Sequence, residues 1–397
     1  MNKPSRNITI GPRHETQICL VSDQAAANLL PALDGSLQAG RIVLVVTAQM
    51  RQKAENLRKV LLQSSRQVEF CDISNAQDFH GMQNELLELA ARQPQGQEVM
   101  LNITGGTKLM SMAVQSVAEQ AGWRMFYVDV HTDTIIWLDR EPSAPQPLQQ
   151  HLKLRHYLQS YGFALKEKPA RPSASAAQQQ LTQTLASQAH SLKDALSSLN
   201  ALAQDAENRR SLSVPLPGNY QNNYPLQHLI DLFESVQALE QKGSALHFAS
   251  EADRDFVKGG WLKLHTMQAL NQAHGAIGVQ DKAIGLEVVH EATGTQNELD
   301  IAFMARNRLF VIECKTARID KPQSSGGKPR PAKANDTLFK LAENCSRIGG
   351  LGAKGMLVSY RALNDPEMRL AKALGIAVVA GQETAQLPQK LKQWVGH

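Results

Sequence analysis

The sequence predicts an α/β protein with two separate sheets, and three observations support this prediction. The chain has 397 residues, too many for one ordinary hydrophobic core, so two domains are expected. Residues 17–139 repeat a short apolar run, a turn and a helical pattern, as parallel α/β sheets do. Residues 297–315 form two alternating arms around a short turn, which is typical of a β-hairpin.

The composition is that of a globular protein with a mild excess of positive charge. Hydrophobic residues make up 42% and charged residues 20%, and 42 basic against 37 acidic side chains give a net charge of +5. This balance is compatible with nucleic-acid binding, although many unrelated proteins share it. The N-terminus lacks an apolar signal region, no run is long enough for a membrane helix, and the four cysteines are scattered. We therefore expect a reduced, cytoplasmic protein without a membrane partner.

The first domain is predicted to hold a Rossmann-like parallel sheet. Strands are expected at 17–22, 41–47, 67–72, 98–104, 124–130 and 134–138, and helices at 24–33, 51–63, 78–92 and 108–121. The strand at 42–46 is apolar on both alternating faces, as expected of a strand that helices cover on both sides.

The remainder is predicted to be a connector followed by a second α/β domain. Residues 141–149 contain three prolines, and 164–219 contain no aromatic residue, so a solvated helix at 178–206 has little from which to build a core. Farther on, helices are expected near 226–241, 252–272 and 335–348, a strand at 355–360, and a βαβ-like ending at 366–380. With the hairpin, these elements predict a mixed sheet flanked by helices.

The predicted hairpin register brings charged residues together. A turn centred between Arg306 and Asn307 pairs Leu299 with Cys314, Ile301 with Ile312 and Phe303 with Phe310, which forms one apolar face. The same register places Asp300 across from Glu313 and Glu298 across from Lys315 on the other face. Because opposed Cβ atoms lie about 5 Å apart, the two carboxylates would repel each other unless a cation lay between them.

This arrangement predicts a metal-dependent phosphodiesterase site. Carboxylate oxygens suit Mg²⁺ or Mn²⁺. Lys315 lies on the same face as Glu313, where it can orient a water molecule or stabilise negative charge. The alternative is an ordinary solvated face, because alternating charges on a hairpin also arise by chance.

A second candidate site lies at the carboxyl ends of the first domain's strands, where open α/β sheets bind ligands. The residues expected there are Ser22, Asp23, Gln24, Thr47, Thr104, Gly105, Gly106, Thr107 and Lys108. Two glycines, a helix N-terminus and a lysine favour a phosphate or another anion. The loop lacks the Walker A spacing and no GxGxxG follows the first strand, so neither nucleotide hydrolysis nor dinucleotide redox chemistry is favoured. A plain strand-to-helix turn is the equal alternative.

Two groups of motifs resemble a known family. Residues 102–110, together with Val21–Gln24, resemble the CARF domain, the sensor of cyclic oligoadenylate in type III CRISPR defence. Gly259–Leu262, Asn297–Asp300 and Glu313–Lys315 look like the restriction-endonuclease-like PD-(D/E)xK core that is attached to CARF domains, and the helix at 337–341 also fits.

The resemblance implies a CARF-type CRISPR ancillary nuclease. Such a protein would be a homodimer that binds cyclic tetra-adenylate across its two-fold axis and cleaves DNA and/or RNA with Mn²⁺ or Mg²⁺. The domains would then be a CARF domain at 1–145, a linker and helical connector at 146–222, and a nuclease domain at 223–397.

The implied roles can be assigned residue by residue. Asp300 and Glu313 would hold the metal together with a backbone carbonyl near Cys314, Lys315 would position the attacking water, and Glu298 would either join a second ion or pair with Lys315. The chain departs from the family pattern at Lys263, where an acidic residue is usual, and this puts a second metal site in doubt.

Basic residues after the catalytic strand are candidates for nucleic-acid binding. They are Lys321, Lys328, Arg330 and Lys333 in a loop rich in Pro, Gly and Ser, and Lys340 on the next helix. A solvated loop is the alternative. Two further functions stay open: a ligand-responsive nucleic-acid-binding protein with an inactive nuclease-like domain, which Lys263 favours, and a nucleotide-processing enzyme acting at Gly105 and Gly106.

Overall fold

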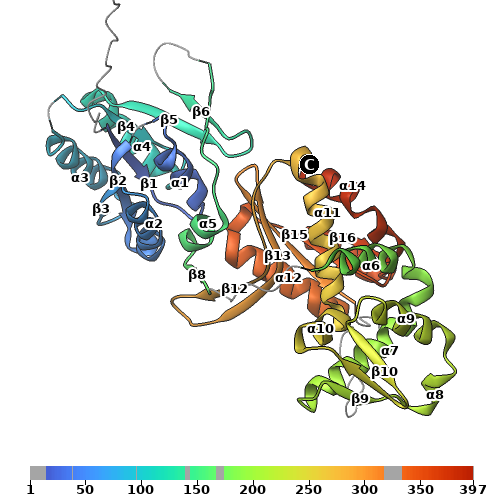
Figure 1. The fold of residues 1–397 in the computed structure, drawn as a ribbon. Coiled ribbons are helices and arrows are strands. Elements are labelled where there is room, and N and C mark those ends of the chain that lie inside the picture. The colour runs from blue at the N-terminus through green and yellow to red at the C-terminus, as the bar shows by residue number, and fades with distance from the viewer. Residues whose placement is uncertain are drawn as a thin grey trace, which may run out of the picture. The chain divides into compact units, whose positions relative to one another are not determined.

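The computed structural model describes residues 15–37, 39–94, 96–138, 144–166, 174–316 and 333–396, and they fold into two compact units (Figure 1). The first unit contains the chain up to Leu165, with the short segments His290–Thr295 and Gly349–Gly352. The second unit contains the rest of the chain. Within the described ranges, no helix is both long enough and apolar enough to span a bilayer.

The first unit is built on the expected parallel sheet. Its strands are β1 (Glu15–Leu20), β2 (Ala39–Thr47), β3 (Gln67–Ile73), β4 (Val99–Asn102), β5 (Arg124–Asp129), β6 (Thr134–Trp137) and β7 (Gln146–Pro147). They lie in the order β3-β2-β1-β4-β5-β6-β7, with β1 to β5 parallel and the last two antiparallel. The Rossmann-like α/β prediction is confirmed, with the strand order reversing between β1 and β4.

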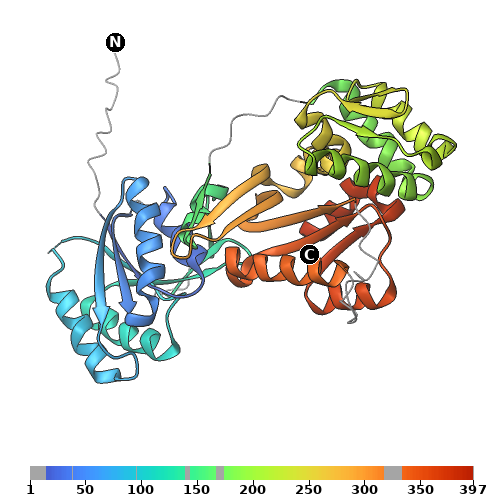
Figure 2. The ribbon, with the colours of Figure 1, turned by 90° about the horizontal axis from the view of Figure 1, so that it is seen from below.

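Helices cover both faces of this sheet, as Figures 1 and 2 show. They are α1 (Ala25–Leu33), η1 (Ala48–Met50), α2 (Arg51–Gln63), α3 (Phe79–Ala91), α4 (Lys108–Ala121) and α5 (Leu154–Ser160), followed by the short strand β8 (Phe163–Leu165). α1, α2 and α5 pack together, and α3 packs against α4. α4 buries Met110, Ala113, Val114 and Val117, which share one helical face.

The second unit contains the expected hairpin within a mixed sheet. β12 (Val279–His290), β13 (Gln296–Ala305), β14 (Arg308–Lys315), β15 (Lys354–Ser359) and β16 (Ile376–Ala380) lie in the order β16-β15-β14-β13-β12. β12, β13 and β14 are antiparallel, and β14, β15 and β16 are parallel. The predicted pairs Ile301–Ile312 and Phe303–Phe310 are confirmed. The twelve-residue strand β12 has no counterpart in the sequence prediction.

Helices enclose the second sheet. They are α10 (Glu251–Asp255), η2 (Phe256–Gly260), α11 (Trp261–Ile277), α12 (Lys333–Gly349), α13 (Asp365–Ala373), η4 (Gly381–Gln386) and α14 (Leu387–Gly396). The short turn η3 (Gly350–Gly352) belongs to the first unit. The face of the hairpin expected to be partly polar is instead buried, since Ala302, Met304, Leu309 and Val311 are at most 1% exposed.

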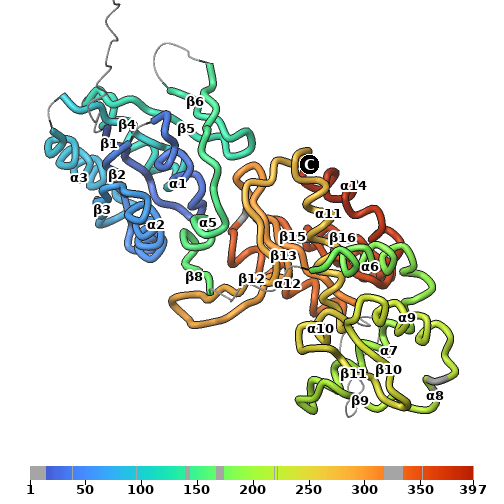
Figure 3. Tube along the Cα trace, in the orientation of Figure 1, coloured from blue at the N-terminus to red at the C-terminus, as the bar shows by residue number. Residues whose placement is uncertain are grey.

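The segment between Ala174 and Phe248 is more structured than expected. It forms α6 (Ala176–Ser187), α7 (Ala189–Asn208), β9 (Ser213–Pro215), α8 (Gly218–Gln221), α9 (Tyr224–Glu234), β10 (Leu239–Lys242) and β11 (Ala245–Phe248), whose course Figure 3 traces. The helix expected to reach residue 241 ends at Glu234, because the hairpin of β10 and β11 follows it. With β9, which precedes the helix, these strands form a three-stranded sheet in the order β10-β11-β9.

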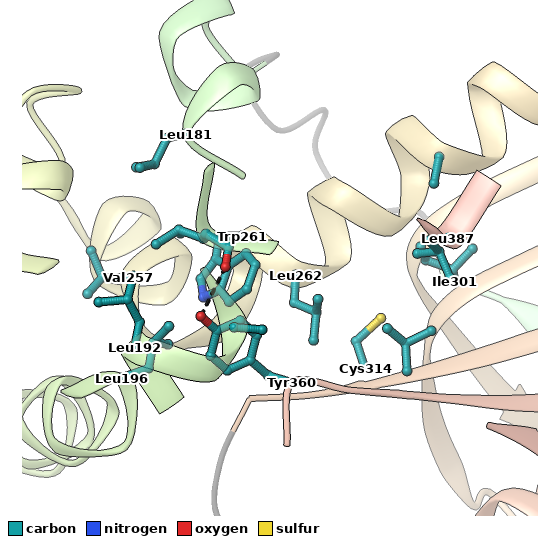
Figure 4. Packing of buried hydrophobic residues seen from close by; sticks show 14 of the residues in the cluster. Leu181, Leu192, Leu196, Val257, Trp261, Leu262, Ile301, Cys314, Tyr360 and Leu387 are labelled. Carbon is teal, nitrogen blue, oxygen red and sulfur yellow. Dashed lines mark hydrogen bonds between the residues drawn. The ribbon is translucent and has the colours of Figure 1, made fainter. Parts of the chain in front are cut away.

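α6 and α7 belong to the core of the second unit, so the expectation of a solvated helix is wrong. Leu185, Leu196 and Leu199 are fully buried in the cluster that also contains Trp261 and Tyr360. Figure 4 shows Trp261 beside Tyr360, whose rings meet edge to face with centroids 5.1 Å apart. The Tyr360 hydroxyl donates a hydrogen bond of 3.0 Å to the carbonyl oxygen of Leu185. α6 is thereby fixed to the sheet of the second unit.

A glycine pair bends the helix that enters the candidate site. Gly259 has a φ of 150°, inside η2, between α10 and α11. A Cβ atom at Gly259 would lie 2.6 Å from the Oγ1 atom of Thr316, the residue directly after β14. Only glycine accommodates both this conformation and this approach.

We therefore predict that Gly259→Ala lowers the free energy of unfolding by roughly 1–3 kcal/mol, because the strained backbone and the overlap with Thr316 act together. Urea denaturation of the full chain measures the change. The matched control is Gly275→Ala in α11, where an added Cβ meets nothing within 4 Å and φ is negative. Equal stability of Gly259→Ala and the parent protein would contradict the assignment.

Candidate nuclease and ligand sites

The carboxylate cluster forms where two strands separate. β13 and β14 pair from Ala305–Arg308 to Ile301–Ile312, and the ladder then stops. Beyond it β13 stays paired with β12, through Glu298 opposite Glu287, while β14 stays paired with β15 through Lys315 opposite Ser359. The expected pairs Asp300–Glu313 and Glu298–Lys315 are therefore not formed as ladder pairs.

The Asp300 side chain on β13 bridges to β14 where the backbone hydrogen bonds between these two strands stop. Its Oδ2 atom accepts a hydrogen bond of 2.8 Å from the backbone N–H of Cys314, in place of a backbone carbonyl. The residue is only 7% exposed. A buried carboxylate held in this way cannot turn freely, so its position relative to β14 is fixed.

Lys263 supplies the positive charge next to Asp300. Its Nζ atom lies 2.6 Å from Oδ1 of Asp300 and 3.0 Å from Oε1 of Glu298. Burial alone lowers the pKa of Lys263, but the two carboxylates reverse this effect and raise the pKa above its usual value. Glu298 therefore pairs with Lys263 and not, as one expectation had it, with Lys315.

Glu313 and Lys315 form the second ion pair, with 2.5 Å between Oε1 and Nζ. Burial raises the pKa of Glu313, the charge of Asp300 raises it further, and Lys315 offsets only part of the effect. Burial lowers the pKa of Lys315, but Glu313 outweighs this and raises it. Among the described residues, the cluster thus holds three carboxylates and two ammonium groups, one negative charge in excess when all are ionised.

Asp300 and Glu313 suit a divalent metal ion by their chemistry. Both offer carboxylate oxygens, and the charge of one disfavours ionisation of the other, a repulsion that a bound cation would relieve. Across the residues described here, no group of three or more His, Cys, Asp or Glu side chains is placed to hold a metal. An ion bound between these two carboxylates would complete its shell with water or substrate oxygens.

Asn200 and Thr266, which the sequence analysis did not single out, support the C-terminal end of β14. The Oγ1 atom of Thr316 donates to the carbonyl oxygen of Lys258 at 3.3 Å and accepts from Nδ2 of Asn200, on α7, at 3.0 Å. On the other side of the strand, the Cys314 thiol lies 3.5 Å from the Thr266 hydroxyl of α11. In the sequence, the pair Gly259-Gly260 was the one sign that the helix approaches the end of β14 closely.

The candidate nucleic-acid-binding residues are only partly visible. Lys321, Lys328 and Arg330 lie outside the described residues, and Lys333 is the first residue of α12. Lys340 is exposed on α12, beside Phe339, whose side chain is 53% exposed.

The candidate ligand site of the first unit lies where the strand order reverses. β1 and β4 are neighbours, and their carboxyl ends lead into Ser22–Gln24 and Thr104–Lys108, while Thr47 ends the adjacent strand β2. A crevice at this point is where open α/β sheets bind ligands. The structure thus brings the sequence-predicted residues to one edge of one sheet.

Hydrogen bonds fix the loop after β4. The buried side chain of Asn102 accepts from both the N–H and the hydroxyl of Thr104, at 3.0 and 2.6 Å. The Thr104 hydroxyl in turn accepts from the N–H of Val128 at 2.7 Å. A Cβ atom at Gly105 would lie 2.1 Å from the carbonyl oxygen of Leu20, so the loop approaches β1 as closely as only glycine allows.

The groups that remain for a ligand lie at the start of α4. Thr107 caps this helix by accepting from the N–H of Met110 at 3.2 Å, and Lys108 follows, exposed, at its first position. Asp23 forms an ion pair with Lys53 of α2. The helix N-terminus and the exposed Lys108 therefore lie along this edge and suit an anion, while the charge of Lys53 is paired with Asp23.

Comparisons with known proteins agree with this division. The family model of the Card1 CARF domain matches residues 16–157, and that of the Card1-like endonuclease domain matches residues 250–397. None of the curated proteins matches the chain.

Among solved structures, VC1899 from Vibrio cholerae superposes with a TM-score of 0.86 at 25% identity, covering 96% of this chain and 98% of that one. Can2 from Sulfobacillus thermosulfidooxidans, solved with cyclic tetra-adenylate, has a TM-score of 0.77 at 22% identity, with 97% and 98% covered. A type III CRISPR defence DNA nuclease activated by cyclic oligoadenylate has a TM-score of 0.53 at 19% identity, with 88% and 46% covered.

The first unit is thus a CARF domain, and the cluster around Asp300 lies in an endonuclease domain. The chain therefore contains a Card1-type CARF domain followed by a Card1-like endonuclease domain.

Proposed function

We propose that this protein is an endonuclease that depends on Mn²⁺ or Mg²⁺, is activated by cyclic tetra-adenylate, and cleaves DNA and/or RNA in type III CRISPR defence. The observation that supports it most is the buried Asp300, which is fixed by the Cys314 amide next to Glu313 and Lys315. Such a site combines oxygen ligands with a positive group at the point where β13 and β14 separate. We further propose that the protein acts in the cytoplasm.

The residues of the site have different proposed roles. A bound divalent ion would supply Lewis-acid stabilisation of the scissile phosphate. Asp300 and Glu313 hold its place with fixed carboxylate oxygens. Lys315 donates one of its three protons to Glu313, which leaves two for a water molecule or a phosphate oxygen. The side chains of Lys263, Glu313 and Lys315 are 27%, 24% and 35% exposed, and this partial shielding from bulk water strengthens each of these interactions.

The nucleic acid would be held by the basic residues after the catalytic strand. Phe339 and Lys340 are consecutive and both exposed on α12, so the ring is available for a stacked base and the ammonium group for a phosphate. Lys321, Lys328, Arg330 and Lys333 would add phosphate contacts.

The CARF domain would bind the activator at the edge formed by Ser22–Gln24, Thr47 and Thr104–Lys108. Can2 binds cyclic tetra-adenylate and shares the fold of nearly the whole chain, which supports this choice of ring. A homodimer is favoured by exposed apolar side chains of the same unit: Met112 on α4 is 60% exposed, and Tyr127 and Ile136 are neighbours on β5 and β6.

A second candidate is a nucleic-acid-binding protein with an inactive nuclease-like domain. The specific observation in its favour is that Lys263 already neutralises Asp300, at 2.6 Å.

One experiment separates the two candidates. The full-length protein is incubated with supercoiled plasmid and with single-stranded RNA, with and without cyclic tetra-adenylate, and with Mn²⁺ or a chelator. We expect cleavage of at least one substrate only when activator and metal are both present. Activator-dependent binding without cleavage under every condition would favour the inactive domain.

We predict that Asp300→Asn and Glu313→Gln each reduce cleavage by on the order of 100-fold or more, because each removes one charged oxygen donor without changing side-chain size. Initial rates of plasmid or RNA cleavage with saturating activator and Mn²⁺ measure the effect. Glu240→Gln, an exposed residue that pairs with Lys242 on the small sheet, is the control and should retain the parent rate. Full activity of either site variant would remove these carboxylates from the mechanism.

For the sensor, Lys108→Ala should weaken binding of cyclic tetra-adenylate by about tenfold or more, since it removes a charged phosphate partner. Thr107→Ala should weaken it by disturbing the helix N-terminus, and Thr107→Ser, which keeps the cap, should restore it. Calorimetry gives the dissociation constants. Arg92→Ala, which removes an exposed cation at the C-cap of α3, serves as the control. Unchanged affinity in both Ala variants would reduce the loop to a structural turn.

A further inference from the structure

Lys263 occupies a place between carboxylates where a metal ion would otherwise be expected. Its Nζ atom is within 3.0 Å of one oxygen of Glu298 and one of Asp300. Its side chain is 27% exposed, so the contact is largely shielded from water. The pair is therefore less screened than an ordinary surface salt bridge.

The fold fixes the position of Lys263 beside Asp300 and Glu298. It follows Trp261 and Leu262, both fully buried in the core of the second unit, and so the start of α11 is fixed. Figure 4 shows these two side chains among the apolar residues of the core. Asp300 is held from the opposite direction by the Cys314 amide. Neither partner can move away without breaking a buried contact.

A second divalent ion would compete directly with this ammonium group. Such an ion would need the oxygens of Glu298 and Asp300 that face Lys263, and it would lie beside a fixed positive charge. The position between Asp300 and Glu313 differs, because Lys263 contacts Asp300 and Glu298 while Lys315 contacts Glu313, and no ion pair of the described residues joins either ammonium group to both Asp300 and Glu313. The cluster thus offers one place for a divalent ion, between Asp300 and Glu313. Lys263 occupies the other place, between Asp300 and Glu298.

We propose that Lys263 is a resident cation that takes the place of a second metal ion. Each nuclease domain then binds one divalent ion, between Asp300 and Glu313, while Glu298 holds Lys263 and no metal. This inference rests on the proposed metal-dependent function and restricts it to a one-ion site. Because part of the Lys263 side chain is exposed, it remains able to donate to a phosphate oxygen of the substrate.

The test counts bound metal without using activity. The full-length protein is titrated with Mn²⁺ in the presence of cyclic tetra-adenylate, and free Mn²⁺ is followed by electron paramagnetic resonance. The Asp300→Asn, Glu313→Gln double variant gives the background from other acidic residues. Above this background we expect one ion per chain for the parent protein and two for Lys263→Met, which keeps the length of the side chain and removes its charge.

Two further variants control the interpretation. Lys258→Met removes a lysine of similar exposure, 28%, that pairs instead with Glu207, and should still bind one ion. Glu298→Gln should also bind one ion with unchanged affinity, since Glu298 contributes no ligand in the parent protein. If Lys263→Met does not fold, Glu298→Gln alone still decides the question.

The outcomes separate the inference from the function on which it rests. Two ions in the parent protein, one ion in a folded Lys263→Met variant, or a loss of affinity in Glu298→Gln would each overturn the inference and leave the nuclease proposal standing. No ion above background in the parent protein and in Lys263→Met, together with cleavage in a chelator, would overturn the metal dependence itself.

Discussion

The ion pair between Lys263 and Asp300 is the interaction on which the nuclease site depends. One oxygen of Asp300 contacts the Lys263 ammonium at 2.6 Å, and the other accepts the Cys314 amide at 2.8 Å. A single buried carboxylate therefore joins helix α11 to strand β14 at the point where β13 and β14 separate. Without this link the separated strands would leave a buried N–H unsatisfied, which is unfavourable in a protein interior. The same contact sets how much negative charge remains for a metal ion and a phosphate.

Packing around the site explains why this geometry is fixed. α11 begins with the fully buried Trp261, whose ring meets Tyr360 edge to face. The residue after the catalytic strand, Thr316, lies against the bend at Gly259 and accepts a hydrogen bond from Asn200 on α7. α7, which lies in the sequence between the CARF and endonuclease domains, thus supports the C-terminal end of β14. A site held by buried contacts on three elements changes little when a substrate arrives, which favours catalysis.

The regular parts of this structure could be predicted from the sequence. The prediction failed where strands from distant segments compete for the same pairing partner. The hairpin register was predictable at Ile301–Ile312 because a two-residue side-chain period and a short turn determine it. Its end was not, because it depends on β12 and β15, which keep β13 and β14 apart. The absence of aromatic residues hid the core role of α6 and α7, although their leucines recur at helical spacing. Lys263 was visible as a departure from the family pattern, but its two partners follow only from the tertiary structure.

Anomalous diffraction is the most direct test of the central claim that the Lys263–Asp300 pair persists in the working site. Crystals of the full-length protein soaked with Mn²⁺ and measured at the manganese edge would locate every bound ion. The account predicts a single peak in contact with Asp300 and Glu313, with the Lys263 ammonium still between Asp300 and Glu298. A peak between Asp300 and Glu298, with Lys263 displaced into solvent, would contradict it.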